Sequence, residues 1–192
     1  GPVLISGVVL AAAGTAVGLK KLDYDRIARA GILSAAFFVA SLIHVPIGPA
    51  NAHLILNGLV GLLLGWAAFP AILVALVLQA MLFQFGGITV LGVNTMIMAL
   101  PALLCYFICS PFLHKKSALA LTAAFACGFL SVALSALILG LALVFTEENF
   151  FEVSAVVIAA HIPVMVIEGL VTAMCVAFLK KIQPNMLPGS PE

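Results

Sequence analysis

The chain is poor in charged residues. Only 15 of its 192 side chains are formally charged, eight Lys or Arg and seven Asp or Glu, whereas 65% of its residues are hydrophobic. A soluble domain of ordinary composition is about 25% charged and about 45–50% apolar. So few charges cannot solvate the surface of a water-soluble protein of this size, which excludes a soluble enzyme and a disordered chain. The net charge of +1 and the scattered basic clusters also argue against nucleic-acid binding.

Sequence motifs for catalysis are also missing. The chain contains no HExxH or GxSxG motif and no Gly-rich P-loop. Its four cysteines, Cys105, Cys109, Cys127 and Cys175, all lie in apolar runs without the spacing of a metal site, so we interpret them as small buried hydrophobic residues. The sequence therefore predicts a protein that is not an enzyme and has no ATPase site. Any uphill transport would take its energy from partner proteins or from an ion gradient.

Long apolar runs make up most of the sequence. Residues 30–114 contain no Asp, Glu, Lys or Arg. A membrane-spanning helix needs about 20 apolar residues, so this stretch crosses a membrane several times, with breaks at Pro and Gly. We predict an all-α, polytopic integral membrane protein with one transmembrane domain over residues 1–182 and a short cytoplasmic tail over residues 183–192. The seven expected transmembrane helices are Val3–Leu19, Ile27–His44, His53–Ala68, Ala71–Phe85, Val93–Leu113, Ser117–Phe145 and Val153–Leu179; the third and fourth are short enough to form a hairpin or a re-entrant pair.

The basic residues predict the orientation. Cytoplasmic loops of membrane proteins carry an excess of Lys and Arg. With seven crossings and the N-terminus outside, every basic residue falls on the cytoplasmic side and the acidic loop of Glu147, Glu148 and Glu152 falls outside. The C-terminus is then cytoplasmic. The basic residues are Lys20, Lys21, Arg26, Arg29, Lys115, Lys116, Lys180 and Lys181.

Polar side chains inside the apolar runs are functional candidates, because they are costly at membrane depth. In this topology His44, His53 and His161 lie toward the outer side. Histidine is the commonest transition-metal ligand, so the cluster indicates capture of a divalent cation at an outer mouth. Glu168 lies seven residues after His161, on the same helix face. Its carboxyl group is interpreted either as a proton or cation group or as a hydrogen-bonded contact between helices.

Several motifs together resemble the nickel/cobalt-capture subunits (CbiM/NikM family) of energy-coupling-factor transporters. The resemblance covers nearly the whole chain, and the combination of Gly-Gly-Ile-Thr with Leu-Gly-Val-Asn-Thr is its most specific part. The motifs are His44-Val45-Pro46, Ala52-His53-Leu54-Ile55-Leu56-Asn57-Gly58, Gly65-Trp66-Ala67-Ala68-Phe69-Pro70, Gln79, Phe85-Gly86-Gly87-Ile88-Thr89, Leu91-Gly92-Val93-Asn94-Thr95, His161-Ile162-Pro163 and Ile167-Glu168-Gly169.

The resemblance implies a seven-helix subunit of the prokaryotic cytoplasmic membrane that takes Ni²⁺ or Co²⁺ from outside as its substrate. Its implied partners are a transmembrane coupling subunit, two ATPase subunits and a small accessory membrane subunit. Docking in such transporters uses helix faces with small residues that let backbones approach closely. Here that predicts Ala36 and Ala40 first, and Ala12 and Ala16 second.

The resemblance also implies the metal ligands. In the family an N-terminal Met-His-Ile-Pro strip supplies the free amine, a backbone nitrogen and an imidazole, and a histidine at the third helix supplies the fourth nitrogen. The matching histidine here is His53. This chain has Gly1-Pro2 at its start, and proline has no amide hydrogen to lose, so we expect this chain without an upstream strip to bind metal weakly. The candidates for supporting or lining the site are His44, Asn57, Gln79, Gln84, Thr89, Asn94 and His161.

Two alternatives remain at the level of the sequence. The same architecture could serve an organic micronutrient, although only 8% of the residues are aromatic and one is Trp, which leaves few rings for stacking. The other alternative is an ion-coupled carrier or channel that uses Glu168, for which Gln79 and Glu168 offer the only polar groups expected in the inner half. The choice between nickel and cobalt also stays open, with a slight preference for nickel from the residues following His53.

Overall fold

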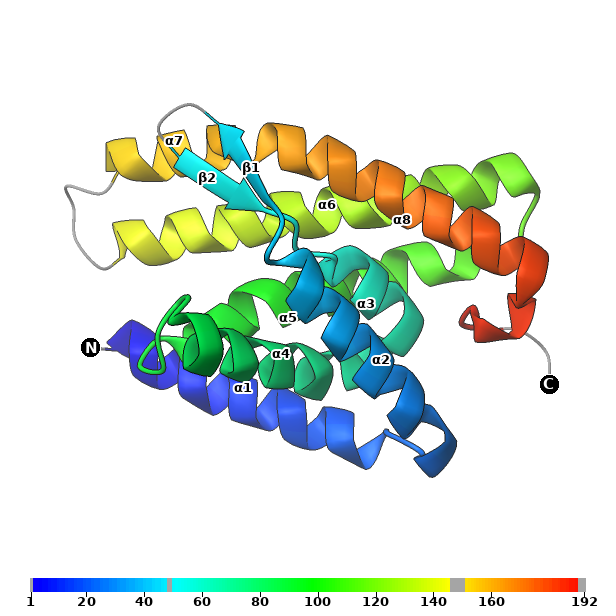
Figure 1. Cartoon of the computed structure of the whole chain (residues 1–192), viewed down its shortest axis with the longest axis horizontal. Helices are drawn as coiled ribbons and strands as arrows, with labels where there is room; N and C mark the ends of the chain where they lie inside the picture. The colour runs from blue at the N-terminus through cyan, green and yellow to red at the C-terminus, as the bar shows by residue number, and fades with distance from the viewer. Residues whose placement is uncertain (1, 48–49, 146–150, 190–192) are drawn as a thin grey trace.

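The computed structural model describes residues 2–47, 50–145 and 151–189, which form a helical bundle with one short β-hairpin (Figure 1). The helices predicted from the sequence are present with changed ends, and the seventh is divided into two. The hairpin between the second and third helices was not predicted. The elements in chain order are α1 (Pro2–Lys20), α2 (Tyr24–Ala40), β1 (His44–Ile47), β2 (Ala50–His53), α3 (Asn57–Leu64), η1 (Gly65–Ala67), α4 (Ala68–Phe83), α5 (Leu91–Cys109), η2 (Ser110–Phe112), α6 (Ser117–Val144), α7 (Phe151–Ala160), α8 (Ile162–Ile182) and η4 (Pro184–Met186).

Helix α3 lies at the centre of the bundle. All eight of its residues are buried, as expected for a helix that is hydrophobic on every face. It packs against α5 and α6, while α6 also packs along α8, and α1 packs against α4 and α5. Figure 1 shows α6 and α8 on one side of the molecule and α1 with α4 on the other. Gly65, at φ 57°, ends α3 and leads through η1 into α4.

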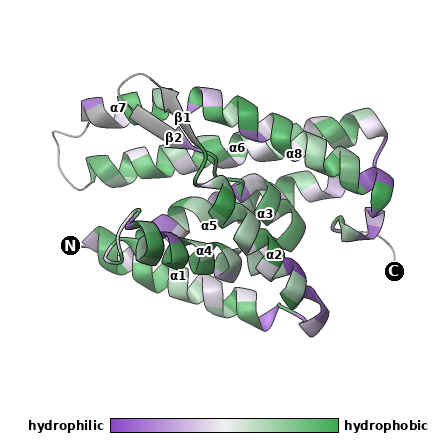
Figure 2. Ribbon diagram, in the orientation of Figure 1, coloured by the Kyte–Doolittle hydropathy of each residue, from purple (hydrophilic) through white to green (hydrophobic). Residues whose placement is uncertain are grey.

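The helices are hydrophobic along most of their length, as the green ribbon of Figure 2 shows, and many of their exposed side chains are apolar. Large hydrophobic side chains such as Ile5, Val9, Ile32 and Met174 are more than half exposed, which a water-soluble surface does not tolerate over so many helices. Within the part of the chain that the structure describes, five helical stretches are long and apolar enough to cross a membrane, and α3 with α4 counts as one of them. The chain is therefore a multi-pass membrane protein, while the number of seven crossings stays a prediction.

The hairpin replaces the helix ends that were expected at His44 and His53. Helix α2 ends at Ala40 and α3 begins at Asn57, and His44 pairs with His53 in the antiparallel ladder. Pro46 disfavours helix both by lacking an amide hydrogen and by pushing the preceding residue into extended backbone. Of the predicted break at Val45–Ala52, Gly48 and Pro49 lie outside the described residues. His53 is consequently a strand residue and not the first residue of a helix.

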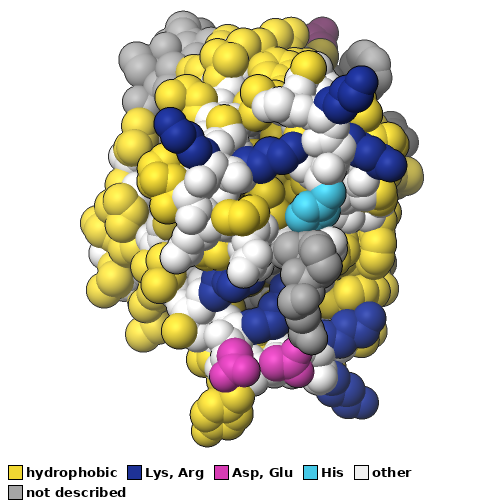
Figure 3. All heavy atoms as spheres, turned by 90° about the vertical axis from the view of Figure 1, so that its right-hand side faces the viewer, with side chains coloured by type: hydrophobic (Ala, Val, Ile, Leu, Met, Phe, Trp, Pro, Cys, Tyr) yellow, Lys and Arg dark blue, Asp and Glu magenta, His cyan; other side chains and the backbone are white. Residues whose placement is uncertain are grey.

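The basic residues gather at one end of the bundle (Figure 3). This end holds the turn between α1 and α2, the turn between α5 and α6, and the end of α8. The first residue of α1 lies at the opposite end. Of the predicted acidic loop, Glu147 and Glu148 lie outside the described residues, and Glu152 is exposed in the first turn of α7. The basic end also holds Asp23 and Asp25 at the start of α2, so only the basic residues are gathered at one end, and the orientation in the membrane stays a prediction.

Residues 183–189 fold back against the basic end of the bundle. Leu187 is 2% exposed and belongs to a buried apolar cluster with Leu59, Leu62 and Leu113. The His114 side chain donates from Nε2 to the Pro188 carbonyl over 2.7 Å. The described part of the tail is thus packed onto the membrane domain.

Candidate functional site

A cavity of about 190 Å³ lies beside the loop between α4 and α5, at the end of the bundle opposite the basic residues (Figure 1). It brings together three of the predicted polar residues: His53 at the end of β2, Gln79 in α4 and Asn94 in the first turn of α5. Forty-one positions separate the first of these residues from the last, so only the packing of α4 and α5 beside the hairpin makes them neighbours. The remaining lining residues are Leu76, Phe85, Gly86, Gly87, Leu91, Ile97, Met98 and Leu139.

The orientation of the His53 ring is fixed by the backbone. Its Nδ1 lies 3.1 Å from the carbonyl oxygen of Leu54. A carbonyl can only accept, so Nδ1 carries a proton, and in the neutral ring the lone pair is then on Nε2. A hydrogen bond of this kind, on the nitrogen that does not bind metal, is the usual support of a histidine ligand. Nε2 is therefore the nitrogen of His53 that is suited to bind a cation.

The segment after His53 is held by Glu168 from α8. Glu168 is fully buried, and its Oε1 accepts hydrogen bonds from the backbone N–H groups of Ile55, at 2.5 Å, and Leu56, at 2.8 Å. These groups precede the first residue of α3, where helix donors lack partners and negative charge is favourable. Leu56 adopts the left-handed conformation, with φ 53°. Glu168 thus caps α3 and anchors the loop that follows His53, which favours the hydrogen-bonded interpretation of Glu168.

Gln79 presents an amide without a partner. Its side chain is 5% exposed, and its Nε2 has no hydrogen-bond partner within the described residues. Buried amides are almost always hydrogen-bonded. Because Gln79 also lines the cavity, its amide is available to a ligand or water molecule placed there.

The loop between α4 and α5 closes over Asn94. Gly86 and Gly87 both have positive φ, at 73° and 72°, which favours glycine at both positions. Gly86 has a second reason: a Cβ there would lie 2.6 Å from Nδ2 of Asn94, whereas a Cβ on Gly87 would meet nothing within 4 Å. The Gly-Gly pair of the sequence motif therefore lets the loop contact Asn94.

Three other predicted residues do not line the cavity. Gln84 and Thr89 are exposed on the loop between α4 and α5. Asn57 is fully buried and connects α3 to α5 and α6 through hydrogen bonds. His44 belongs to β1, and its side chain lies outside the described residues.

His161 has a structural role at a helix break. The single helix predicted over Val153–Leu179 is divided into α7 and α8, because Pro163 cannot donate to the helix ladder. The backbone N–H of His161 donates to Ile158, which leaves the Val157 carbonyl to accept from Nδ1 of the His161 ring at 2.7 Å. His161 does not line the His53 cavity.

Sequence reasoning missed the partners of Asn57. Its Nδ2 donates to Ser135 Oγ at 2.9 Å and to the Met98 carbonyl at 3.2 Å, and Ser131 Oγ donates to its Oδ1 at 3.1 Å. Ser131 and Ser135 are four residues apart in an otherwise apolar helix, so they share one face of α6. This four-residue spacing was the sequence feature that could have indicated a polar contact in the interior of the bundle. Met98 gives no such signal, because methionine is ordinary in an apolar helix.

Among the described residues, the lining of the cavity supplies one strong metal ligand, His53. Across residues 2–47, 50–145 and 151–189, no three His, Cys, Asp or Glu side chains gather as a metal site. A second cavity of about 470 Å³ adjoins the first and shares Asn94, Ile97 and Leu139 with it. Pro2, Val3 and Leu4, at the start of α1, line this second cavity. Residues placed before Pro2 would therefore start next to the cavity of His53.

Comparisons with known proteins find relatives that are named for metal transport. Residues 1–186 match the family CbiM, described as "Cobalt uptake substrate-specific transmembrane region". A Haemophilus influenzae protein assigned to metal transport is 38% identical over 97% of this chain and 92% of its own length. The fused nickel transport protein NikMN of Rhodobacter capsulatus is 42% identical over 43% of this chain and 26% of its own length. The crystal structure of a transition metal transporter superposes with a TM-score of 0.77 at 24% identity, covering 93% of this chain and 88% of that one.

Proposed function

Because the chain belongs to the CbiM family of cobalt-uptake substrate-specific transmembrane regions, we propose that it is the substrate-capture subunit of an energy-coupling-factor importer for Ni²⁺ or Co²⁺. The observation that carries this proposal is the cavity that joins His53, Gln79 and Asn94 at the end opposite the basic residues. The basic end faces the cytoplasm, so the cavity opens toward the outside, where the ion is captured. The membrane is the prokaryotic cytoplasmic membrane.

The metal is held by nitrogen atoms in this proposal. His53 Nε2 supplies one, and an N-terminal Met-His strip preceding α1 supplies the others. The position of Pro2 supports this, because a strip ending there starts in a cavity that shares Asn94, Ile97 and Leu139 with the cavity of His53. Tetragonal nitrogen ligation suits Ni²⁺. Gln79 and Asn94 then contact the chelating strip or the ligating ring, as polar groups around metal ligands do.

Energy for uptake comes from partner proteins in the proposed complex: a transmembrane coupling subunit, two ATPase subunits and a small accessory membrane subunit. Small residues on outward faces suit docking to a coupling helix. Ala12 and Ala16 are both exposed on α1, whereas on α2 Ala36 is exposed and Ala40 is buried inside the chain. The α1 pair therefore offers the more complete docking face.

Calorimetric titration with Ni²⁺ and Co²⁺ in detergent tests the capture site. The protein carrying Met-His-Ile-Pro before Pro2, with a free amine, is expected to bind tightly, and the chain as given weakly. Loss of residues that only support metal ligands costs about 10–100-fold in affinity, so His53→Ala in the extended protein is expected to cost at least about 100-fold. His161→Ala is the matched control, because that ring serves the helix break and should leave the affinity near that of the parent.

Three outcomes would contradict the proposal. Tight Ni²⁺ binding by the chain as given would remove the need for the strip. Equal losses from His53→Ala and His161→Ala would mean that His53 is not a ligand. If neither protein binds either metal, an organic micronutrient becomes the better-supported substrate.

Gly86→Ala tests the contact between the loop and Asn94. Both Gly86→Ala and Gly87→Ala place a side chain at positive φ, which costs about 1–2 kcal/mol. Only the Gly86 variant also displaces the Asn94 side chain. We expect similar thermal midpoints for the two variants but a Ni²⁺ affinity about 10-fold lower for Gly86→Ala in the extended protein. Equal affinities would mean that Asn94 does not contribute.

A further inference from the structure

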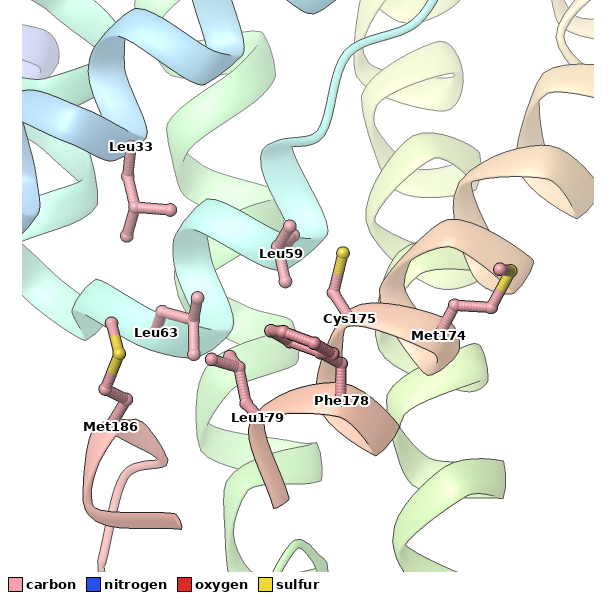
Figure 4. Close-up of a pocket in the computed structure, with 8 residues that line it drawn as sticks. All are labelled: Leu33, Leu59, Leu63, Met174, Cys175, Phe178, Leu179 and Met186. Atoms are coloured by element: carbon pink, nitrogen blue, oxygen red, sulfur yellow. The ribbon is translucent and has the colours of Figure 1, made fainter. Parts of the chain in front are cut away.

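An apolar groove of about 360 Å³ lies between α2, α3, α8 and the tail (Figure 4). All of its lining residues are hydrophobic. In Figure 4, Leu59 and Leu63 of α3 face Phe178 and Leu179 of α8, with Leu33 of α2 at one side and Met186 of the tail at the other. Phe178 is 61% exposed, so the groove opens to the lipid-facing surface of the bundle.

Basic residues continue both walls of this groove. On α2, Arg29 lies one turn before Leu33, on the same helix face. On α8, Met174, Phe178 and Lys181 follow the i, i+4, i+7 spacing of one face. Both basic residues lie at the end of the bundle where Lys and Arg gather (Figure 3). The groove therefore passes from an apolar lining to a positively charged rim at the level of the membrane surface.

We propose that this groove binds one acyl chain of an anionic phospholipid, whose phosphate is held between Arg29 and Lys181. The cytoplasmic leaflet is negatively charged, and each Lys or Arg near its surface contributes about 1 kcal/mol of attraction. An apolar lining with a cationic rim matches the two parts of such a lipid. The proposal does not depend on metal capture.

The charge beside the groove favours an anionic lipid over an apolar partner helix. The lining residues are apolar, whereas Arg29 and Lys181 next to them carry positive charge that a phosphate complements and an apolar helix does not. A lipid in this position touches α2, α3, α8 and the tail together, and a ligand that binds only the folded state stabilises it.

Cys175 is a reporter inside the groove. It lines the groove and is half-buried, whereas Cys105, Cys109 and Cys127 are buried in the bundle. The experiment measures the rate at which a membrane-permeant maleimide alkylates Cys175, by mass spectrometry of the protein in nanodiscs of phosphatidylcholine or of phosphatidylglycerol. Native mass spectrometry of the same samples counts retained lipids.

Alkylation is expected to be at least threefold slower in phosphatidylglycerol, with one phosphatidylglycerol molecule retained. In the Arg29→Gln/Lys181→Gln variant both effects should disappear. Lys20→Gln/Lys116→Gln removes the same charge from elements that do not line the groove, and it should keep both effects.

Equal rates in the two lipids would overturn the proposal. Equal behaviour of the two double variants would also overturn it, because general surface charge would then explain the result. Protection of Cys175 that requires the assembled transporter, in either lipid, would assign the groove to a protein partner instead.

Discussion

Glu168→Ala is expected to destabilise the protein strongly and to weaken metal binding together. The substitution removes the acceptor of the Ile55 and Leu56 N–H groups at the start of α3. Each donor left buried without a partner costs about 1–3 kcal/mol. The loop that follows His53 also loses its anchor, so the Ni²⁺ affinity of the protein with the N-terminal strip should fall about 10–100-fold, as for other groups that position metal ligands.

Glu168→Gln is the matched control for this prediction. The amide oxygen of glutamine can accept the same two hydrogen bonds without the charge. We therefore expect Glu168→Gln to retain more than half of the stability that Glu168→Ala loses, as measured by thermal unfolding in detergent. If Glu168→Gln folds normally but abolishes uptake, the charge itself is used, and the ion-coupled carrier becomes the better interpretation.

Asn57→Asp is expected to have the second large effect. Asn57 is fully buried, and its Nδ2 donates to Ser135 and to the Met98 carbonyl. Aspartate keeps the shape but loses both donated hydrogen bonds. The Ser135 hydroxyl can turn to donate to the new carboxylate, whereas the Met98 carbonyl can only accept and is left facing a negatively charged oxygen. An uncompensated charge in a dry interior costs about 3–5 kcal/mol. Thermal unfolding in detergent should therefore show a large loss of stability.

The loss of stability in Asn57→Asp is compared with the losses in Asn57→Leu and Ser135→Ala. Leucine keeps most of the volume and removes three hydrogen bonds worth about 1 kcal/mol each, so its effect should be intermediate. Ser135→Ala removes one hydrogen bond and should have the smallest effect. An Asn57→Asp protein as stable as the Leu variant would mean that water or a cation reaches this position.

Both predictions depend on contacts that sequence patterns could not supply. Glu168 and Ile55 are 113 positions apart, and Asn57 and Ser135 are 78 positions apart. The sequence marked Glu168 and Asn57 as polar residues at membrane depth, but it left the role of Glu168 between an ion-binding group and a contact. Choosing between these two roles required the position of the backbone N–H groups at the start of α3, which Glu168 binds. Ser131 and Ser135 shared a helix face in the sequence, yet nothing local indicated which residue they met.

The hydrophobicity of a segment and the positions of its charges can be read from residues that are neighbours in the chain. The sequence by itself therefore determined the membrane class, the helical content and the gathering of basic residues at one end. The motifs around His53, Gln79 and Asn94 also indicated the family from the sequence alone. Only the tertiary structure decided the hairpin between α2 and α3, the break at His161 and the choice of the residues that line the cavity. These features depend on hydrogen-bond partners and packing between distant segments, which the local pattern of a chain does not contain.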